Sequence, residues 1–213
     1  MRLSEQTWPV LVSKVRLGSD EYRVVRPARA VENALLYEGR YGAHFEIGKR
    51  AAVVLAMAWG LAARSPHSLI HLPLRGPTSA DDVRPLDLVL LHHRLAFPVS
   101  RWKEVRARLG RGAPHRVTLP PRAFRRASHH PQRHREFRDH LRWSVAADTL
   151  LLIGSRTAFE LEVHRVRALA EDGPAHLAKY PGIHYCTEIG MGRTWTDRRN
   201  PSAELHVDHL PLP

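Results

Sequence analysis

The sequence predicts an α/β or α+β fold, in which two to four helices pack on a mixed β-sheet. A chain of 213 residues with 43% hydrophobic residues suffices for a single domain, residues 1–213, with a sizeable core. Short apolar runs typical of buried strands alternate with helical patterns, which indicates strand–helix–strand units. Turn residues between alternating segments indicate antiparallel hairpins at the ends of the sheet.

Three elements are predicted in the first third of the chain. Residues 9–26 form a hairpin around Gly18-Ser19-Asp20, because apolar and polar residues alternate on both sides of a turn-forming triplet. Residues 30–37 are predicted to form a short helix. Residues 49–64 form a long apolar helix, which Pro66 ends.

The middle of the chain predicts two strands and a further helix. Residues 68–72 and 86–92 are strand-like, and the second run is almost continuously apolar, as expected for a strand buried on both faces. The polar residues 76–85 connect them as a loop. Residues 100–109 are predicted to be helical with Ser100 as the N-cap.

Less regular structure is predicted on either side of the last helix. Residues 116–119 form a weak strand, and residues 122–140 a loop followed by a basic helix that starts near Pro131. After residue 180 the chain is predicted to be mostly irregular until a final strand at residues 203–209.

The clearest local signal is a strand–helix unit at residues 149–174. Residues 149–154 are an apolar strand, and Thr157 with Glu160 has the spacing of a capping box. The predicted helix runs from about residue 158 to 172, where Gly173-Pro174 ends it. Four apolar residues share the face expected to meet the core: Phe159, Val163, Val166 and Ala170.

Positive charge is concentrated in residues 101–142, the basic segment. It holds 13 Lys and Arg residues against three acidic ones, so it carries +10 of the chain's net +12. A GC-rich coding sequence explains why arginine outnumbers lysine by 29 to 4, but not why the charge is segregated. Segregation of this kind indicates a surface that faces an anion.

The leading functional hypothesis is therefore a cytoplasmic, non-enzymatic protein that binds a polyanion, most plausibly nucleic acid. Aromatic residues interleave with the arginines of the basic segment, which suits phosphate contacts combined with base stacking. A plain solvated basic face and an acidic protein partner are the alternatives. The predicted phosphate contacts are Arg122, Arg125, Arg126, Arg133, Arg135 and Arg138.

A second hypothesis places an anion at the turn formed by Gly154, Ser155, Arg156 and Thr157. Free amides at a helix N-terminus attract anions, so the chain would be a small enzyme or ligand-binding protein for a phosphorylated or carboxylated substrate. The turn matches neither a Walker A nor a GxGxxG motif, and a simple capped turn is the competing interpretation. The same applies to Gly48-Lys49-Arg50.

Metal-binding signals are weak. His184, Cys186 and Met191 are residue types that bind soft metals, but their spacing fits no known motif. Residues Glu204, His206 and Asp208 share one face of the final strand, either as a metal-binding or proton-transfer row or as the solvent face of an edge strand. The sequence therefore predicts no metal and no cofactor, and it assigns no catalytic residue.

The sequence also predicts the compartment. One cysteine excludes an intramolecular disulfide, and the N-terminus lacks the apolar segment of a signal peptide. The most apolar run, residues 51–63, is well short of the ~20 residues that span a bilayer. We expect a cytoplasmic protein without a membrane partner.

Overall fold

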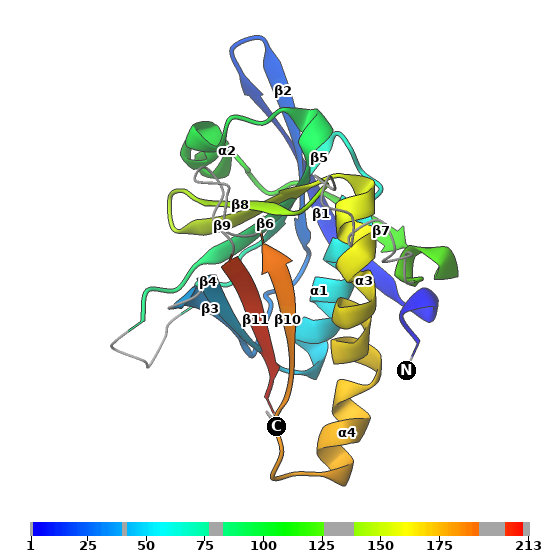
Figure 1. The fold of residues 1–213 in the computed structure, drawn as a ribbon. Helices are drawn as coiled ribbons and strands as arrows, with labels where there is room; N and C mark the ends of the chain where they lie inside the picture. Colours follow the sequence, from blue (N-terminus) through cyan, green and yellow to red (C-terminus); the bar gives the residue numbers. More distant parts are fainter. Residues whose placement is uncertain (1, 40–41, 77–82, 126–138, 192–202, 211–213) are drawn as a thin grey trace.

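The computed structural model describes residues 2–39, 42–76, 83–125, 139–191 and 203–210. Two mixed β-sheets and a pair of packed helices form the core of this part of the chain, which confirms the predicted α/β class (Figure 1). The helices are α1 (Lys49–Ala62), α2 (Trp102–Ala107), α3 (Arg156–Glu171) and α4 (Gly173–Lys179).

Sheet A has seven strands and sheet B has four. In spatial order, sheet A contains β7 (Ala113–Thr118), β1 (Thr7–Leu17), β2 (Asp20–Pro27), β5 (Ser68–Leu72), β6 (Asp87–His92), β9 (Thr149–Gly154) and β8 (Arg142–Val145). Sheet B contains β10 (Tyr185–Met191), β11 (Ala203–His209), β4 (Gly42–Ile47) and β3 (Ala34–Gly39). Parallel pairs (β2–β5, β6–β9 and β11–β4) occur among antiparallel ones.

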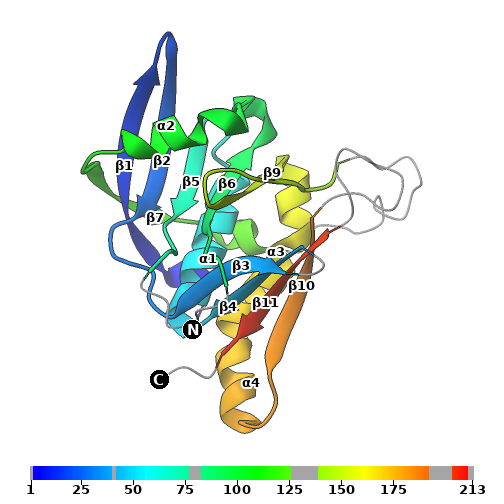
Figure 2. The same ribbon diagram turned by 90° about the vertical axis from the view of Figure 1, so that its left-hand side faces the viewer.

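The packed helices α1 and α3 join the two sheets. α1 contacts β5 and β6 of sheet A and β4 of sheet B, while α3 contacts β9 and β10. The other face of sheet A is covered by α2, whose Trp102 and Val105 are buried among residues of β1, β2 and β9. Figure 2 shows the β1–β2 hairpin and α4 at opposite ends of the molecule. No helix in the described ranges has the length and apolarity needed to cross a bilayer.

Several predicted elements are confirmed by the structure. The hairpin turns at Gly18, whose φ of 65° is one that glycine adopts without strain. The helix at 49–64 is α1, and the strands at 68–72, 149–154 and 203–209 are β5, β9 and β11. Helix α3 buries Phe159, Val163, Val166 and Ala170, as the apolar face predicts.

Three predictions of local structure are wrong. Residues 30–37 do not form a helix, because Asn33 has a φ of 53°, which interrupts a right-handed helix. Residues 34–37 belong to strand β3, in which Leu36 is buried as β3 pairs with β4. Strand β10 lies in the part predicted to be irregular, since its residues Ile189 and Met191 are buried in the core. Ser100 does not cap a helix: it lies inside the 3₁₀ turn Val99–Arg101 that precedes α2.

Candidate functional site

The basic segment does not form one continuous surface in the described ranges. One part is α2, which lies on a face of sheet A, and two others are β7 and β8, at opposite edges of that sheet. A further part is the 3₁₀ turn η4 (Pro121–Phe124), which contacts α3. Charges that are contiguous in the sequence are therefore separated by the width of a seven-stranded sheet.

Some arginines of the segment make contacts within the protein. Arg101 donates to Asp20 at 2.9 Å, and Arg108 donates to the carbonyl oxygen of Arg16 at 3.2 Å. Arg106 donates to the carbonyl oxygen of Ala147 at 2.7 Å. These side chains attach α2 to neighbouring elements, so part of the segregated charge has a structural role.

Two predicted phosphate contacts are placed beside α3. Arg122 and Arg125 are exposed on and directly after η4. The other four, Arg126, Arg133, Arg135 and Arg138, lie outside the described residues.

Arg122 lies beside two arginines that share one carboxylate. Glu160 accepts hydrogen bonds from Arg64 at 2.9 Å and from Arg156 at 2.8 Å, and Arg64 also donates to the carbonyl oxygen of Arg122 at 3.3 Å. Burial lowers the pKa of the Arg64 guanidinium, and the charges of Arg156 and Arg122 lower it further against the opposing effect of Glu160. We call Arg64, Arg122 and Arg156 the arginine cluster, and the exposed Arg125 directly follows η4.

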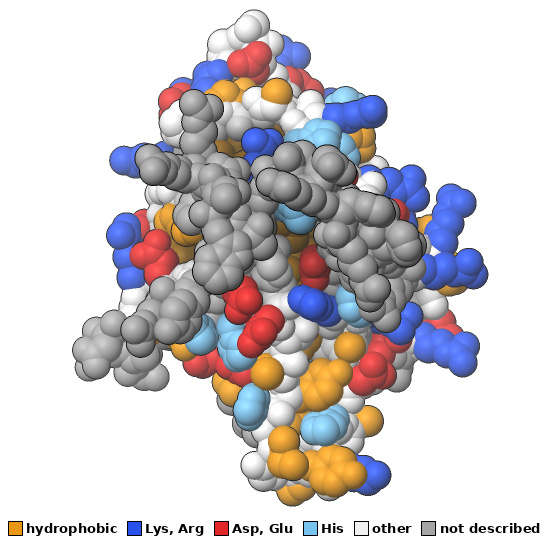
Figure 3. Space-filling model, viewed as in Figure 1, with side chains coloured by type: hydrophobic (Ala, Val, Ile, Leu, Met, Phe, Trp, Pro, Cys, Tyr) orange, Lys and Arg blue, Asp and Glu red, His pale blue; other side chains and the backbone are white. Residues whose placement is uncertain are grey.

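The arginine cluster joins the two sites that the sequence predicted separately. Arg156 comes from the strand–helix turn and Arg122 from the basic segment, and Arg64 at the end of α1 lies between them. Figure 3 shows Lys and Arg side chains gathered along the side of the molecule to the right of α3. Among the described residues, Glu160 is the one carboxylate that pairs with these guanidinium groups, so the three positive charges of the cluster are only partly neutralised.

The turn at Gly154–Thr157 is capped, but not by the predicted residue. The Ser155 hydroxyl accepts a hydrogen bond from the Ala158 amide at 3.0 Å and donates to Asp139 Oδ2 at 2.6 Å. Thr157 is exposed, one residue inside the helix, and Glu160 binds arginines instead. The predicted capping box is therefore wrong, because α3 begins two residues earlier than the spacing indicated.

Replacing Ser155 or Thr157 by alanine, one at a time, tests whether the observed residue Ser155 or the predicted residue Thr157 caps α3. Ser155→Ala should lower the free energy of unfolding by about 1 kcal/mol, because the Ala158 amide loses its acceptor. Thr157→Ala should change it by less than about 0.5 kcal/mol. Urea denaturation followed by circular dichroism measures both values. A larger effect at Thr157 than at Ser155 would contradict the observed cap.

A histidine lies at the same end of the sheet as this turn. His92 ends β6 directly beside Gly154 of β9, and its Nδ1 accepts from the Arg94 amide at 3.1 Å. Burial lowers the pKa of His92, as do the neighbouring His93 and Arg94, while Asp139 opposes them. The Ser155 hydroxyl is engaged as a helix cap. The hypothesis of an enzyme at this turn stays a prediction.

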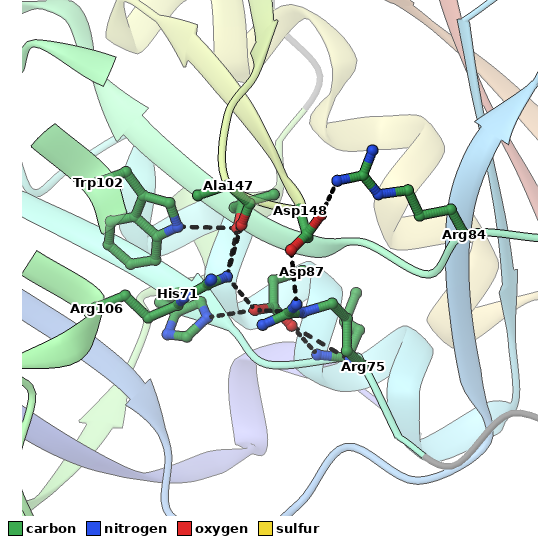
Figure 4. Close-up of polar contacts among 10 residues, drawn as sticks. His71, Arg75, Arg84, Asp87, Trp102, Arg106, Ala147 and Asp148 are labelled. Atoms are coloured by element: carbon green, nitrogen blue, oxygen red, sulfur yellow. Dashed lines mark hydrogen bonds and ion pairs between the residues drawn. The ribbon is translucent and has the colours of Figure 1, made fainter. Parts of the chain in front are cut away.

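The most connected polar group is Asp87, which the sequence analysis missed (Figure 4). Its Oδ1 accepts from the amides of Leu74 and Arg75 at 3.0 and 3.2 Å. Its Oδ2 lies 3.2 Å from Arg75 Nε, 3.3 Å from Arg106 Nη1 and 3.5 Å from His71 Nε2. A charged residue at the start of an otherwise apolar strand was the signal available in the sequence.

Asp87 is ionised and has a structural role. Burial alone would raise its pKa, but the hydrogen bond and charge of His71 and the two amides outweigh burial and bring the pKa to about 2. The side chain is only 4% exposed, so a dissolved ligand has little access to it. Arg75 also pairs with Asp148, which in turn binds Arg84, so the cluster connects the loop after β5 to the start of β9.

A cavity of about 360 Å³ lies at the N-terminal end of α1. It adjoins the Gly48-Lys49-Arg50 segment, where Gly48 is the N-cap. Apolar side chains such as Trp8 and Val54 line it together with the cationic Arg29 and Arg50. Neither Ser155 nor His92 is among its lining residues, so it is separate from the turn at the start of α3.

The two weak metal-binding signals meet on sheet B. Strand β11 is not an edge strand, because it lies between β10 and β4. Its Asp208 lies beside Cys186 of β10, and its His206 lies beside His44 of β4, a residue that the sequence analysis did not single out.

Comparison with known proteins adds no functional information. Neither protein-family models, nor curated proteins, nor solved structures give a match to this chain. Its function is therefore inferred from its own residues.

Proposed function

We propose that this protein binds a polyanion, with nucleic acid as the leading case, through the arginine cluster beside α3. The observation that carries the proposal is the sharing of Glu160 by Arg64 and Arg156, with Arg122 adding a third positive charge. One carboxylate does not neutralise three cations, so a bound phosphate would relieve their mutual repulsion.

The chemistry of the cluster suits phosphate groups. Guanidinium groups bind phosphate oxygens through paired hydrogen bonds, and Arg122 and Arg125 are exposed to solvent. The N-terminus of the 16-residue helix α3 adds a partial positive charge at Arg156. The remaining predicted contacts follow Arg125 directly in the sequence.

A salt titration tests the proposal. With about five phosphate contacts, log affinity for a fluorescent single-stranded oligonucleotide should fall against log salt with a slope of roughly −3.5. The triple variant Arg122→Gln, Arg125→Gln, Arg156→Gln should bind more weakly, and its slope should become shallower, about −1.4, because three contacts are lost. Fluorescence anisotropy over a series of salt concentrations measures both quantities.

A control that removes two positive charges elsewhere is available at the far end of the β1–β2 hairpin. Lys14 and Arg16 are 71% and 81% exposed, and Lys14→Gln with Arg16→Gln removes charge away from the cluster. This variant should keep most of the affinity and the slope. An affinity that does not depend on salt, or equal losses of affinity in both variants, would refute the proposal. Binding to an acidic protein but to no DNA or RNA would favour an interaction module instead.

A further inference from the structure

Sheet B carries ligand-type side chains on the face that turns away from α1 and α3. Along β11, Leu205 and Val207 are buried in the core, while His206 and Asp208 alternate with them on the other face. Figure 3 shows histidine and carboxylate side chains next to one another over this sheet. The face combines His44 and Glu46 of β4, His206 and Asp208 of β11, and Cys186 and Glu188 of β10.

Three potential ligands converge within this face. Parallel pairing places His206 beside His44, with ring centroids 5.2 Å apart, and Asp208 lies two residues further along β11. One nitrogen of each histidine and one carboxylate oxygen lie within 4.8 Å of one another. Because zinc bonds to nitrogen and oxygen ligands are about 2.0–2.2 Å long, small side-chain rotations would bring all three onto one ion.

His206 has the surroundings of a metal-binding histidine. Its Nε2 lies 3.2 Å from Asp208 Oδ1, and its Nδ1 lies 3.8 Å from Glu188 Oε1. A carboxylate on the nitrogen opposite the metal fixes the tautomer and makes the imidazole a stronger donor. A small rotation of the exposed Glu188 side chain would bring its carboxylate within hydrogen-bond distance of Nδ1, where it would position His206.

The His44 ring is held by two residues of β3. Tyr37 stacks on it with centroids 5.5 Å apart and an angle of 11° between the rings. On the same strand, a Cβ atom at Gly39 would lie 2.2 Å from His44 Cδ2, so the absence of a side chain there makes room for the ring. Stacking on Tyr37 and the space at Gly39 therefore favour the orientation in which the His44 ring faces His206.

The charge on this face also favours a cation. Glu46 lies beside Asp208 in the β4–β11 register, and like charges on neighbouring strands destabilise a sheet. A divalent ion bound at Asp208 would offset this repulsion between Glu46 and Asp208, whatever the orientation of the two histidine rings.

We propose that His44, His206 and Asp208 bind a divalent first-row transition metal of the Zn²⁺ type. Two imidazoles and one carboxylate suit such an ion, and three protein ligands leave a fourth position open to water or substrate. The site departs from the sequence expectation of no metal, and it goes beyond the proposed polyanion binding, since the arginine cluster contributes nothing to it.

A second ligand set shares Asp208. His184, Cys186 and Asp208 also offer atoms within 4.8 Å of one another. His184 is exposed and precedes strand β10, whereas His44 and His206 are half-buried on paired strands. The paired strands hold their ligands in place, so the His44 set is the site that we assign.

Calorimetric titration of the metal-free full-length chain with Zn²⁺ tests the assignment. We expect one ion per chain, and a loss of affinity of at least ~100-fold in His44→Ala and in His206→Ala, because each removes a direct ligand while loss of an outer-shell partner alone costs 10–100-fold. Glu188→Gln should cost about 10-fold. Co²⁺ should give the visible absorption of a four-coordinate site without a thiolate charge-transfer band.

Matched controls separate this site from its alternatives. His115→Ala removes an exposed histidine on β7, and it should keep wild-type Zn²⁺ affinity, as should Cys186→Ala. Circular dichroism confirms that each variant is folded. The assignment is overturned if the wild type binds no Zn²⁺, if Cys186→Ala loses binding while His44→Ala keeps it, or if His115→Ala weakens binding as much as His206→Ala.

Discussion

Replacing Asp87 by alanine is expected to lower the free energy of unfolding by about 3–5 kcal/mol. The change removes the acceptor of the Leu74 and Arg75 amides and leaves the guanidinium groups of Arg75 and Arg106 without this counter-charge. Removing one member of a buried ionic cluster costs this much because the remaining charges stay desolvated. Chemical denaturation at neutral pH measures the loss.

The same cluster gives the unfolding free energy a defined pH dependence. The pKa of Asp87 is about 2 in the folded protein, against an ordinary value of 3.8. The ionised carboxylate therefore stabilises the fold fully above about pH 5, and this contribution is lost as the pH falls towards 2. In Asp87→Asn, which cannot ionise, the deficit relative to wild type should be constant above about pH 5 and shrink below it.

An exposed acidic residue provides the control for Asp87. Glu21 forms ion pairs with Lys14 and Arg16 on the solvent side of the β1–β2 hairpin. Because solvent screens such pairs, Glu21→Ala should cost less than about 1 kcal/mol. Similar losses for Asp87→Ala and Glu21→Ala would show that the Asp87 cluster does not stabilise the core.

Replacing Phe159 by alanine is expected to cost about 3–5 kcal/mol. The ring is fully buried and packs edge-to-face on Trp59, with centroids 5.3 Å apart, at the contact between α1 and α3. Truncation removes buried apolar surface and opens a cavity where both helices meet. Trp59 Nε1 also donates to the carbonyl oxygen of Phe159 at 2.9 Å, so the two helices limit how far this cavity can collapse.

Two substitutions calibrate the Phe159 result. Phe159→Leu keeps most of the side-chain volume and should cost less than about 1.5 kcal/mol. Ile183→Ala removes an apolar side chain that is 55% exposed and should cost less than about 0.5 kcal/mol. Thermal and urea denaturation of the three variants should rank Phe159→Ala as the least stable. A cost below that of Ile183→Ala would contradict the packing of α3.

The sequence predicted the elements whose signals are local. The apolar run of β9 and the apolar face of α3 predicted their structure, because alternation and helical periodicity depend only on neighbouring residues. The cap of α3 was misplaced by two residues, since Ser155 and Thr157 are both good capping residues and only the chain path selects between them. Helix propensity at 30–37 was likewise overridden when β3 paired with β4.

The proposed sites depend on contacts that local sequence does not encode. Arg64, Arg122 and Arg156 lie far apart in the chain and meet because α1, η4 and α3 pack together. His44 meets His206 only through the parallel pairing of β4 with β11. The sequence by itself determined the basic charge and most of the strands and helices. The tertiary structure decided which side chains meet, because the pairing of distant strands is fixed by burial of the whole core rather than by any one segment.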